Sequence, residues 1–102
     1  MQEFDAPFGK VQVLESTDKF GSSILLIEPG KEIPKEFHKK MKEIEVILEG
    51  EVICNGKIQK PGDVNIWKIN QVHSYKNESN SAVKILCITI PPYDPEDIFK
   101  VE

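Results

Sequence analysis

Apolar and polar residues alternate along most of the chain in short runs, and turn residues separate these runs. The clearest turn signals are Pro29-Gly30, Glu49-Gly50, Asn55-Gly56, Pro61-Gly62 and the polar loop 77–81. Because successive side chains of a strand point to opposite faces, this alternation predicts short β-strands. The predicted strands lie near Lys10–Glu15, Ser22–Glu28, Glu32–His38, Glu43–Glu49, Glu51–Asn55, Lys57–Gln59, Asp63–Trp67, His73–Asn77 and Val83–Ile90.

The aliphatic composition favours the same class. Ile and Val together supply 21 residues, whereas Ala and Leu supply 7, and β-branched side chains fit pleated strands better than helical turns. Asn55-Gly56 predicts a two-residue hairpin turn of type I′, because both residues tolerate positive φ. The regular spacing predicts an all-β sandwich or barrel, and 102 residues indicate one domain, 1–102. The proline-rich tail 91–97 is expected to run extended.

Charge and cysteine usage narrow the classes of function. The chain has 13 basic and 17 acidic residues, a net charge of −4, and every basic residue is lysine. Without arginine there is no bidentate clamp for phosphate or guanine, which argues against nucleic-acid binding. No apolar run is long enough to span a bilayer, and the acidic N-terminus does not resemble a secretory signal, so a cytoplasmic location is expected. Cys54 and Cys87 lie in apolar runs and are expected to be buried free thiols.

The candidate chemistry lies in two segments that each contain one of the two histidines. Glu36 and His38 are two residues apart, so on a strand both side chains leave the same face. Glu43 opens the next strand, and an antiparallel return could bring its carboxylate back to that pair. His73 opens another strand after a polar turn. These side chains could therefore converge on one point.

The first segment resembles a motif of the cupin family, G-x5-H-x-H-x4-E-x6-G. Gly30, His38, Glu43 and Gly50 stand at their places in this motif, and Glu36 replaces the first histidine. The family fold implies a small antiparallel jelly-roll barrel that holds a metal ion, usually with three histidines and one glutamate.

The second segment resembles the other cupin motif, G-x5-P-x-G-x2-H-x3-N. Gly62, His73 and Asn77 keep their places, while Lys68 replaces the proline and Asn70 the glycine. Together the two motifs extend the resemblance over residues from about 21 to 90, most of the chain, and the N-terminal strand and C-terminal tail are expected to pack around this barrel.

Carried over position by position, the resemblance implies the metal ligands Glu36, His38, Glu43 and His73. Such a set suits one divalent transition metal, namely Fe, Mn, Zn, Ni or Co, with positions open for water or substrate. Two carboxylates would make the ion a weaker Lewis acid than a three-histidine site does. Without the resemblance, each histidine alone is more simply structural, and Glu36 could be a solvated charge on a lysine-rich edge.

Two further side chains are candidate catalytic groups. Glu45 shares a strand face with Glu43 and is either a second carboxylate in the cavity or turned outward by a bulge. Tyr75 shares a face with His73 and is either a pocket wall or proton donor, or a packing residue. Trp67 and Phe37 are read as core or dimer-contact residues. The lysines at 39, 40 and 42 could attract an acidic substrate, or form a solvated loop.

A second, fainter resemblance concerns the cupin domain of the mannose-6-phosphate isomerase and mannose-1-phosphate guanylyltransferase group. It is carried by the non-histidine first ligand position before x-H-x4-E, by Pro7-Phe8-Gly9 and by Pro95-Glu96-Asp97-Ile98. It implies aldose–ketose isomerisation of a sugar phosphate, which the lack of arginine disfavours. Three hypotheses stay open: a metal-dependent isomerase or dioxygenase acting on a small carbonyl or enol compound, a non-catalytic cupin that binds a small ligand as sensor or carrier, and a degenerate scaffold. The apolar alternation on both faces of the hairpin 43–54 further predicts a homodimer.

Overall fold

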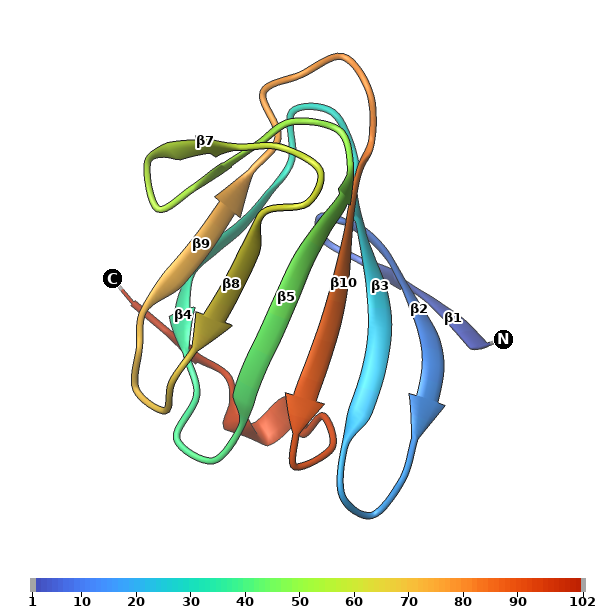
Figure 1. Ribbon diagram of the computed structural model, residues 1–102, viewed down its shortest axis with the longest axis vertical. Coiled ribbons are helices and arrows are strands. Elements are labelled where there is room, and N and C mark those ends of the chain that lie inside the picture. Colours follow the sequence, from blue (N-terminus) through green and yellow to red (C-terminus); the bar gives the residue numbers. More distant parts are fainter. Residues whose placement is uncertain (1, 102) are drawn as a thin grey trace.

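The computed structural model describes residues 2–101 and is built almost entirely of strands (Figure 1). The strands are β1 (Gln2–Ala6), β2 (Gly9–Ser16), β3 (Gly21–Ile27), β4 (Glu32–Phe37), β5 (Lys42–Glu49), β6 (Val52–Cys54), β7 (Lys57–Gln59), β8 (Val64–Trp67), β9 (His73–Lys76), β10 (Val83–Ile90) and β11 (Phe99–Lys100). Every strand predicted from the alternation is present, with bounds within one residue. Within residues 2–101, no helix has the length and apolarity needed to cross a membrane.

The strands form two antiparallel sheets. Sheet A has the order β1-β2-β3-β10-β5-β8, and sheet B the order β11-β4-β9-β6-β7. Both sheets contribute to one buried core, in which Ile27, Ile47 and Ile85 of sheet A meet Val52 and Tyr75 of sheet B. Among the described residues no strand pairing joins the sheets, so the jelly roll is open at its edges. The predicted all-β jelly-roll class is confirmed.

The inner face of sheet A changes from apolar to polar along β5 and β10, which lie side by side (Figure 1). Ile47 is paired with Ile85 in the apolar part, and the next inward pairs are Glu45 with Cys87 and Glu43 with Thr89. All of these side chains are buried. Strand alternation therefore directs polar groups into one end of the interior without interrupting the sheet.

The turn and the cysteines behave as predicted. Asn55 and Gly56 have φ values of 49° and 81°, as a type I′ turn between β6 and β7 requires. Cys54 and Cys87 are both buried and free.

The C-terminal tail corrects the expectation that residues 91–97 run extended. Pro95–Asp97 form a 3₁₀ helix that is capped by Asp94, whose side chain accepts a hydrogen bond from the Glu96 backbone N–H. Proline suits the first position of a helical turn, because its missing N–H has no partner there and its φ is already helical. The following strand β11 pairs with β4, and together with β1 it was absent from the predicted strands.

Asn77 is the first residue of the loop between β9 and β10, and it is fully buried. Its Nδ2 donates to the carbonyl oxygens of Ile27 and Ser81, at 2.9 and 2.8 Å. Its Oδ1 accepts from the backbone N–H and the hydroxyl of Ser79. This side chain therefore ties the loop after β9 to the end of β3.

We expect Asn77→Ala to lower the free energy of unfolding by about 1–3 kcal/mol, because it leaves the buried carbonyl of Ile27 without this donor. Chemical denaturation measures the change. Asn80→Ala, in the exposed part of the same loop, is the matched control and should stay within about 0.5 kcal/mol of the wild type. Equal effects of the two substitutions would contradict the role assigned to Asn77.

Candidate metal centre

The side chains of Glu36, His38, Glu43 and His73 converge between the two sheets. Glu36 lies on β4, where it is paired with His73 of β9, and His38 directly follows β4. Glu43 reaches the same place from β5 in the opposite sheet. The Nε2 atoms of His38 and His73 lie 2.9 and 3.0 Å from one oxygen, Glu43 Oε1. All four side chains are buried.

Each imidazole is oriented by a backbone carbonyl. His38 Nδ1 lies 2.7 Å from the carbonyl oxygen of Asp97, and His73 Nδ1 lies 3.0 Å from that of Gln71. Because a carbonyl oxygen only accepts hydrogen bonds, Nδ1 carries the proton in both rings. In the neutral imidazoles the lone pairs are then on Nε2, which faces Glu43. This is the tautomer that a metal-binding histidine needs.

The polar atoms at the point of convergence are not satisfied by one another. His38 Nε2 and Glu43 Oε1 are buried and lack a hydrogen bond of acceptable geometry, although they are only 2.9 Å apart. Buried polar atoms are normally paired. A divalent cation between these nitrogen and carboxylate donors would satisfy them, so the residues fit a metal ion. Glu36, His38 and His73 each offer a ligand atom within 4.8 Å of the others, as do Glu43, Glu45 and His73.

Glu36 is shared between the centre and the C-terminal strand. Its Oε2 lies 3.6 Å from His38 Nε2, and its Oε1 lies 3.0 Å from the ammonium group of Lys100 on β11. The side chain is buried, so it is not the solvated edge charge that the sequence left open. The ammonium group of Lys100 therefore offsets part of the negative charge of Glu36.

Glu45 points into the interior and is 2% exposed, which excludes an outward bulge. Its Oε1 accepts hydrogen bonds from Trp67 Nε1 at 2.6 Å and from the Tyr75 hydroxyl at 2.9 Å. Tyr75 in turn accepts a hydrogen bond from Asn65 Nδ2. The Tyr75 proton is therefore engaged with Glu45, and Trp67 is a core residue that also stacks on the His73 ring, with the ring centres 5.0 Å apart.

Burial and charge shift the titration of this cluster. Burial and the Glu43 carboxylate raise the pKa of Glu45 to about 7. Burial opposes the charged form of His38, but the negative charge of the adjacent Glu43 carboxylate outweighs it and raises the pKa of His38 to about 9. Burial likewise opposes ionisation of Glu43, but His38 and His73 lower its pKa to about 2. Burial raises the pKa of Tyr75.

Two supporting residues come from the C-terminal segment and were not identified from the sequence. The Asp97 carboxylate accepts hydrogen bonds from the backbone N–H groups of Lys39, Lys40 and Met41, at 2.8, 2.9 and 2.8 Å, and its own carbonyl orients His38. Asp97 therefore fixes the turn between β4 and β5. Lys100 is the second. No local sequence pattern predicts either contact, because each joins residues that are about sixty positions apart in the sequence.

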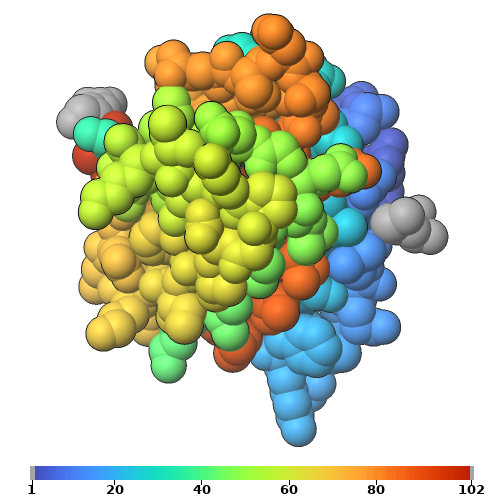
Figure 2. Space-filling view, turned by 45° about the horizontal axis from the view of Figure 1, so that its top comes forward, coloured from blue at the N-terminus to red at the C-terminus, as the bar shows by residue number. Residues whose placement is uncertain are grey.

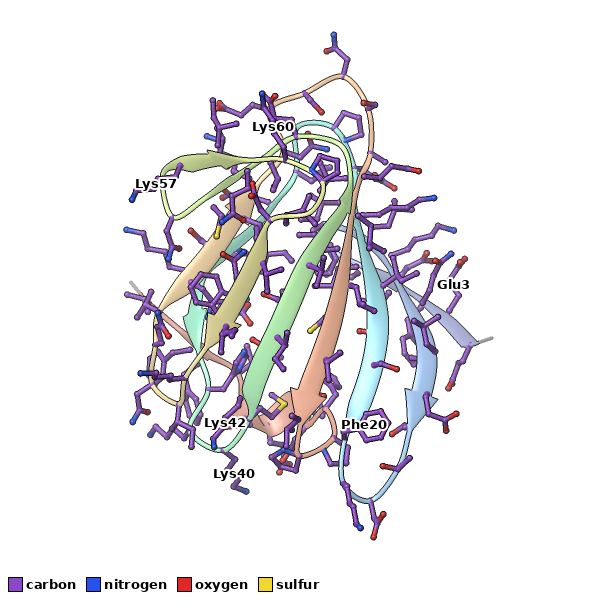
Figure 3. All side chains as sticks on the ribbon, in the orientation of Figure 1. Glu3, Phe20, Lys40, Lys42, Lys57 and Lys60 are labelled. Atoms are coloured by element: carbon purple, nitrogen blue, oxygen red, sulfur yellow. The ribbon has the colours of Figure 1, made fainter. Side chains whose placement is uncertain are left out.

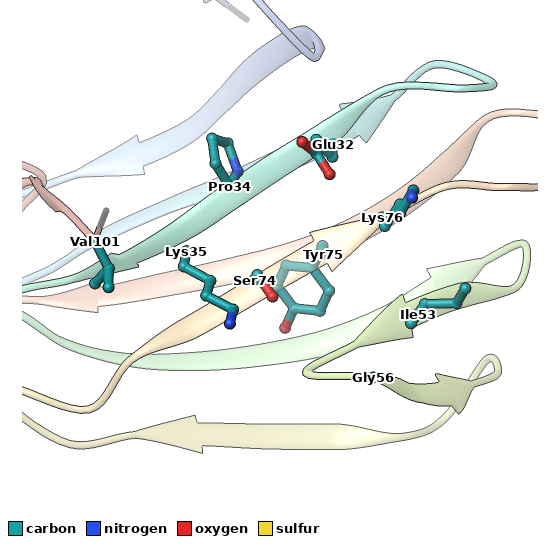
Figure 4. Close-up of a pocket in the computed structure, with 9 residues that line it drawn as sticks. All are labelled: Glu32, Pro34, Lys35, Ile53, Gly56, Ser74, Tyr75, Lys76 and Val101. Atoms are coloured by element: carbon teal, nitrogen blue, oxygen red, sulfur yellow. The ribbon is translucent and has the colours of Figure 1, made fainter.

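The centre opens into a cavity of about 810 Å³ between the sheets. Apolar side chains of both sheets, including Val11, Val13, Leu25 and Ile33, form much of its wall. A second hollow of about 390 Å³ lies along β4 and β9 and is lined by residues such as Glu32, Lys35 and Lys76 (Figure 4). None of the described residues that line it is histidine or cysteine, and the large cavity is the one that reaches the candidate ligands.

The lysine-rich turn lies outside this cavity. Lys40 and Lys42 point away from the ribbon (Figure 3), and both are exposed. Lys39 Nζ lies 4.4 Å from the centre of the Phe99 ring, and Phe99 stacks on Phe37. The lysine side chains of this turn are therefore exposed to solvent, and Phe37 packs against β11.

Comparison with known proteins identifies relatives of the whole fold. The family model described as "Cupin domain" matches residues 23–89. A solved protein with a double-stranded β-helix domain from Klebsiella pneumoniae is 25% identical, with 78% of this chain and 69% of that chain covered and a TM-score of 0.71. KdgF from Halomonas sp. is 15% identical, with 94% and 93% covered and a TM-score of 0.82. No curated protein sequence matches significantly.

A third solved structure bears on the fainter resemblance. A sugar phosphate isomerase from the cupin superfamily of Silicibacter pomeroyi is 19% identical, with 71% of this chain and 50% of that chain covered and a TM-score of 0.62. At this identity the likeness concerns the fold alone.

The proton on His38 gives the metal-free protein a pH-dependent stability of defined sign. An unfolded histidine has a pKa of about 6.5, and the pKa of His38 in the folded protein is about 9. The stabilising contribution of the protonated ring is therefore complete below about pH 6.5 and is lost as the pH rises through about 9. We expect calorimetry of EDTA-treated protein to show a falling melting temperature across this window.

His38→Gln removes the titrating group and should show a smaller decrease over the same pH range. A wild-type melting temperature that rises between about pH 6.5 and about 9 would contradict the charge pairing described here.

Proposed function

Because this chain belongs to the cupin family, we propose that it is a metal-dependent enzyme that moves a proton on a small carbonyl- or enol-containing metabolite. The observation that carries this proposal is the position of Glu45. A buried carboxyl group whose pKa is near 7 faces the cavity beside the candidate metal ligands. Such a group can both accept and return a proton near neutral pH.

His38, Glu43 and His73 would hold the ion, and Glu36 would supply a fourth ligand. When bound, a divalent ion of Fe, Mn, Zn, Ni or Co would polarise the carbonyl oxygen of the substrate. Because two carboxylates offset its charge, the protein relies more heavily on its own proton-transfer group than a site with three histidines would.

Glu45 would act as the base and then as the acid. A C–H bond beside the substrate carbonyl breaks, its proton passes to the Glu45 carboxylate, and the electron pair moves onto the carbonyl oxygen. Return of the proton to that oxygen gives the enol isomer, and its return to the original carbon gives exchange of the α-proton, in both cases with no net gain or loss of electrons. Trp67 and Tyr75 hold Oε1 in place through their hydrogen bonds and so keep the carboxyl group aimed at the cavity.

Oxygen chemistry is the second candidate, and the Glu36–Lys100 ion pair favours it. If that pair keeps Glu36 from binding the ion, His38, His73 and Glu43 remain as two histidines and one carboxylate, the arrangement of many non-haem iron oxygenases. A non-catalytic cupin that binds a small ligand is the third reading. Oxygen consumption by the Fe²⁺-loaded protein would favour the second, and ligand binding without any turnover the third.

We expect the Zn²⁺-loaded protein to accelerate exchange of the α-protons of hydroxyacetone in D₂O, followed by NMR. Glu45→Gln should lower this rate by about 10²-fold or more, because it removes the proton acceptor, while calorimetric Zn²⁺ affinity stays close to that of the wild type. His73→Ala should lose both the acceleration of proton exchange and the affinity for Zn²⁺.

Glu51→Gln, an exposed site beyond the end of the same hairpin strand, is the control and should change neither quantity. Undiminished exchange in Glu45→Gln would contradict the proton-transfer role and leave metal binding intact.

We also propose that the chain forms a homodimer in which the outer face of sheet A packs against a second copy. Two rows of aliphatic side chains cross β8, β5 and β10: Ile66, Ile44 and Ile88, then Val64, Val46 and Leu86. Ile66 and Val64, on the edge strand β8, are 64% and 56% exposed. The segment with β7 and β8 lies at the front of the molecule in Figure 2. An apolar face of this kind is typical of a protein interface, and a homodimer is the commonest assembly.

We expect the wild type to sediment as a dimer at micromolar concentration and Ile66→Lys to shift it towards the monomer, because burying an unpaired ammonium group in the interface is unfavourable. Ile58→Lys is the control, since Ile58 on β7 is 63% exposed but lies in the other sheet. A wild-type monomer of 11.6 kDa would contradict the proposal.

A further inference from the structure

Thr89 carries a polar atom that the structure leaves without a partner. Among the described residues, three buried side-chain atoms lack one: His38 Nε2, Glu43 Oε1 and Thr89 Oγ1. The first two face the candidate metal position. Thr89 is 4% exposed and lines the same large cavity. Since a buried hydroxyl without a hydrogen bond is costly, its position in the cavity wall indicates a ligand group that pairs with it.

The cross-strand neighbours of Thr89 are a glycine on one side and a candidate metal ligand on the other. Thr89 lies on β10, between β5 and β3 (Figure 1), and is paired with Glu43 on one side and with Gly21 on the other. A Cβ atom at position 21 would lie 3.1 Å from Thr89 Oγ1. A side chain at position 21 would therefore crowd the hydroxyl, at a place that the backbone of Pro92 and Tyr93 also borders. Glu43, a candidate metal ligand, is the cross-strand neighbour, and such neighbours lie about 5 Å apart.

The charges around the cavity restrict the ligand. Lys100 is the one lysine among the described lining residues, and it is already paired with Glu36. Glu43 and Glu45 line the cavity as well, and the exposed carboxylates of Asp5, Glu15 and Glu32 stand at its rim. This balance disfavours a phosphorylated or polyanionic ligand. The apolar wall of Val11, Val13, Leu25 and Ile33 accommodates a hydrocarbon part.

We infer that Thr89 is a specificity-determining residue whose hydroxyl binds a second oxygen of the ligand, next to the carbonyl oxygen held at the metal centre. The ligand class is an unphosphorylated α-hydroxy carbonyl or α-dicarbonyl compound with an apolar remainder. This inference rests on the proposed function, since the first oxygen is placed by the metal centre. Thr89 takes no part in proton transfer and selects between ligands through one hydrogen bond.

The test uses two compounds that differ in a single hydroxyl group, 1-hydroxypentan-2-one and pentan-2-one, and the Zn²⁺-loaded protein. Calorimetry gives the ratio of their dissociation constants for the wild type, Thr89→Val and Thr89→Ser. We expect Thr89→Val to reduce the preference for the hydroxyketone about fivefold, the effect of one hydrogen bond. Thr89→Ser keeps a hydroxyl and should preserve the preference. Zn²⁺ affinity should be equal in all three proteins.

A stability measurement separates recognition from a structural role. Thr89→Val removes a hydroxyl that has no partner in the protein, so its melting temperature without ligand should equal or exceed that of the wild type. A destabilised Thr89→Val would assign the hydroxyl to the fold, and an unchanged preference would place the ligand hydroxyl elsewhere. Either result overturns the inference.

Two further outcomes test the ligand class and the metal centre separately. If the Zn²⁺-loaded wild type binds neither compound, the ligand class is wrong. If the wild type does not bind Zn²⁺ or another first-row dication, the metal centre itself fails, and the inference fails with it. Direct Zn²⁺ titration distinguishes these two results.

Discussion

Burial of ionisable side chains at one end of an otherwise apolar interior is the constraint on which this structure depends. A charged group without a partner is very unfavourable in such a place. The fold therefore gives each carboxylate specific partners. Glu43 faces two imidazoles, Glu36 faces Lys100, and Glu45 accepts hydrogen bonds from aromatic side chains. The contacts of Glu43 with the two imidazoles and of Glu45 with Tyr75 connect sheet A with sheet B, which no strand pairing joins among the described residues.

The same alternation that builds the core also builds the site. Along β5 the inward side chains are Glu43, Glu45 and Ile47, so a shift of one residue in the pairing with β10 would turn all of them outward. The register of this central pair thus determines both the apolar packing and the position of the polar cluster. In a fold whose core and site lay on separate strands, a change of register could alter the apolar packing without moving the polar cluster.

The sequence was sufficient for nine of the eleven described strands and for the convergence of the candidate ligands, because the former depends on local periodicity and the latter on motif spacing. It also placed Glu45 on the inner face, although only the structure excludes the outward bulge. It did not reveal Asp97, Lys100 or the 3₁₀ helix. Their contacts join residues about sixty positions apart, and such pairings follow from the three-dimensional path of the chain. The strand β1 was missed because its side chains are mostly exposed and give little hydrophobic alternation.

Trp67 also determines the fluorescence of the protein. It is the one tryptophan of the sequence, its ring stacks on His73, and its N–H is bonded to Glu45. The ultraviolet emission of the protein therefore arises from a single indole in direct contact with a candidate metal ligand and with the candidate base. Changes of charge or occupancy at the centre reach that indole without any added label, so the molecule contains its own optical reporter.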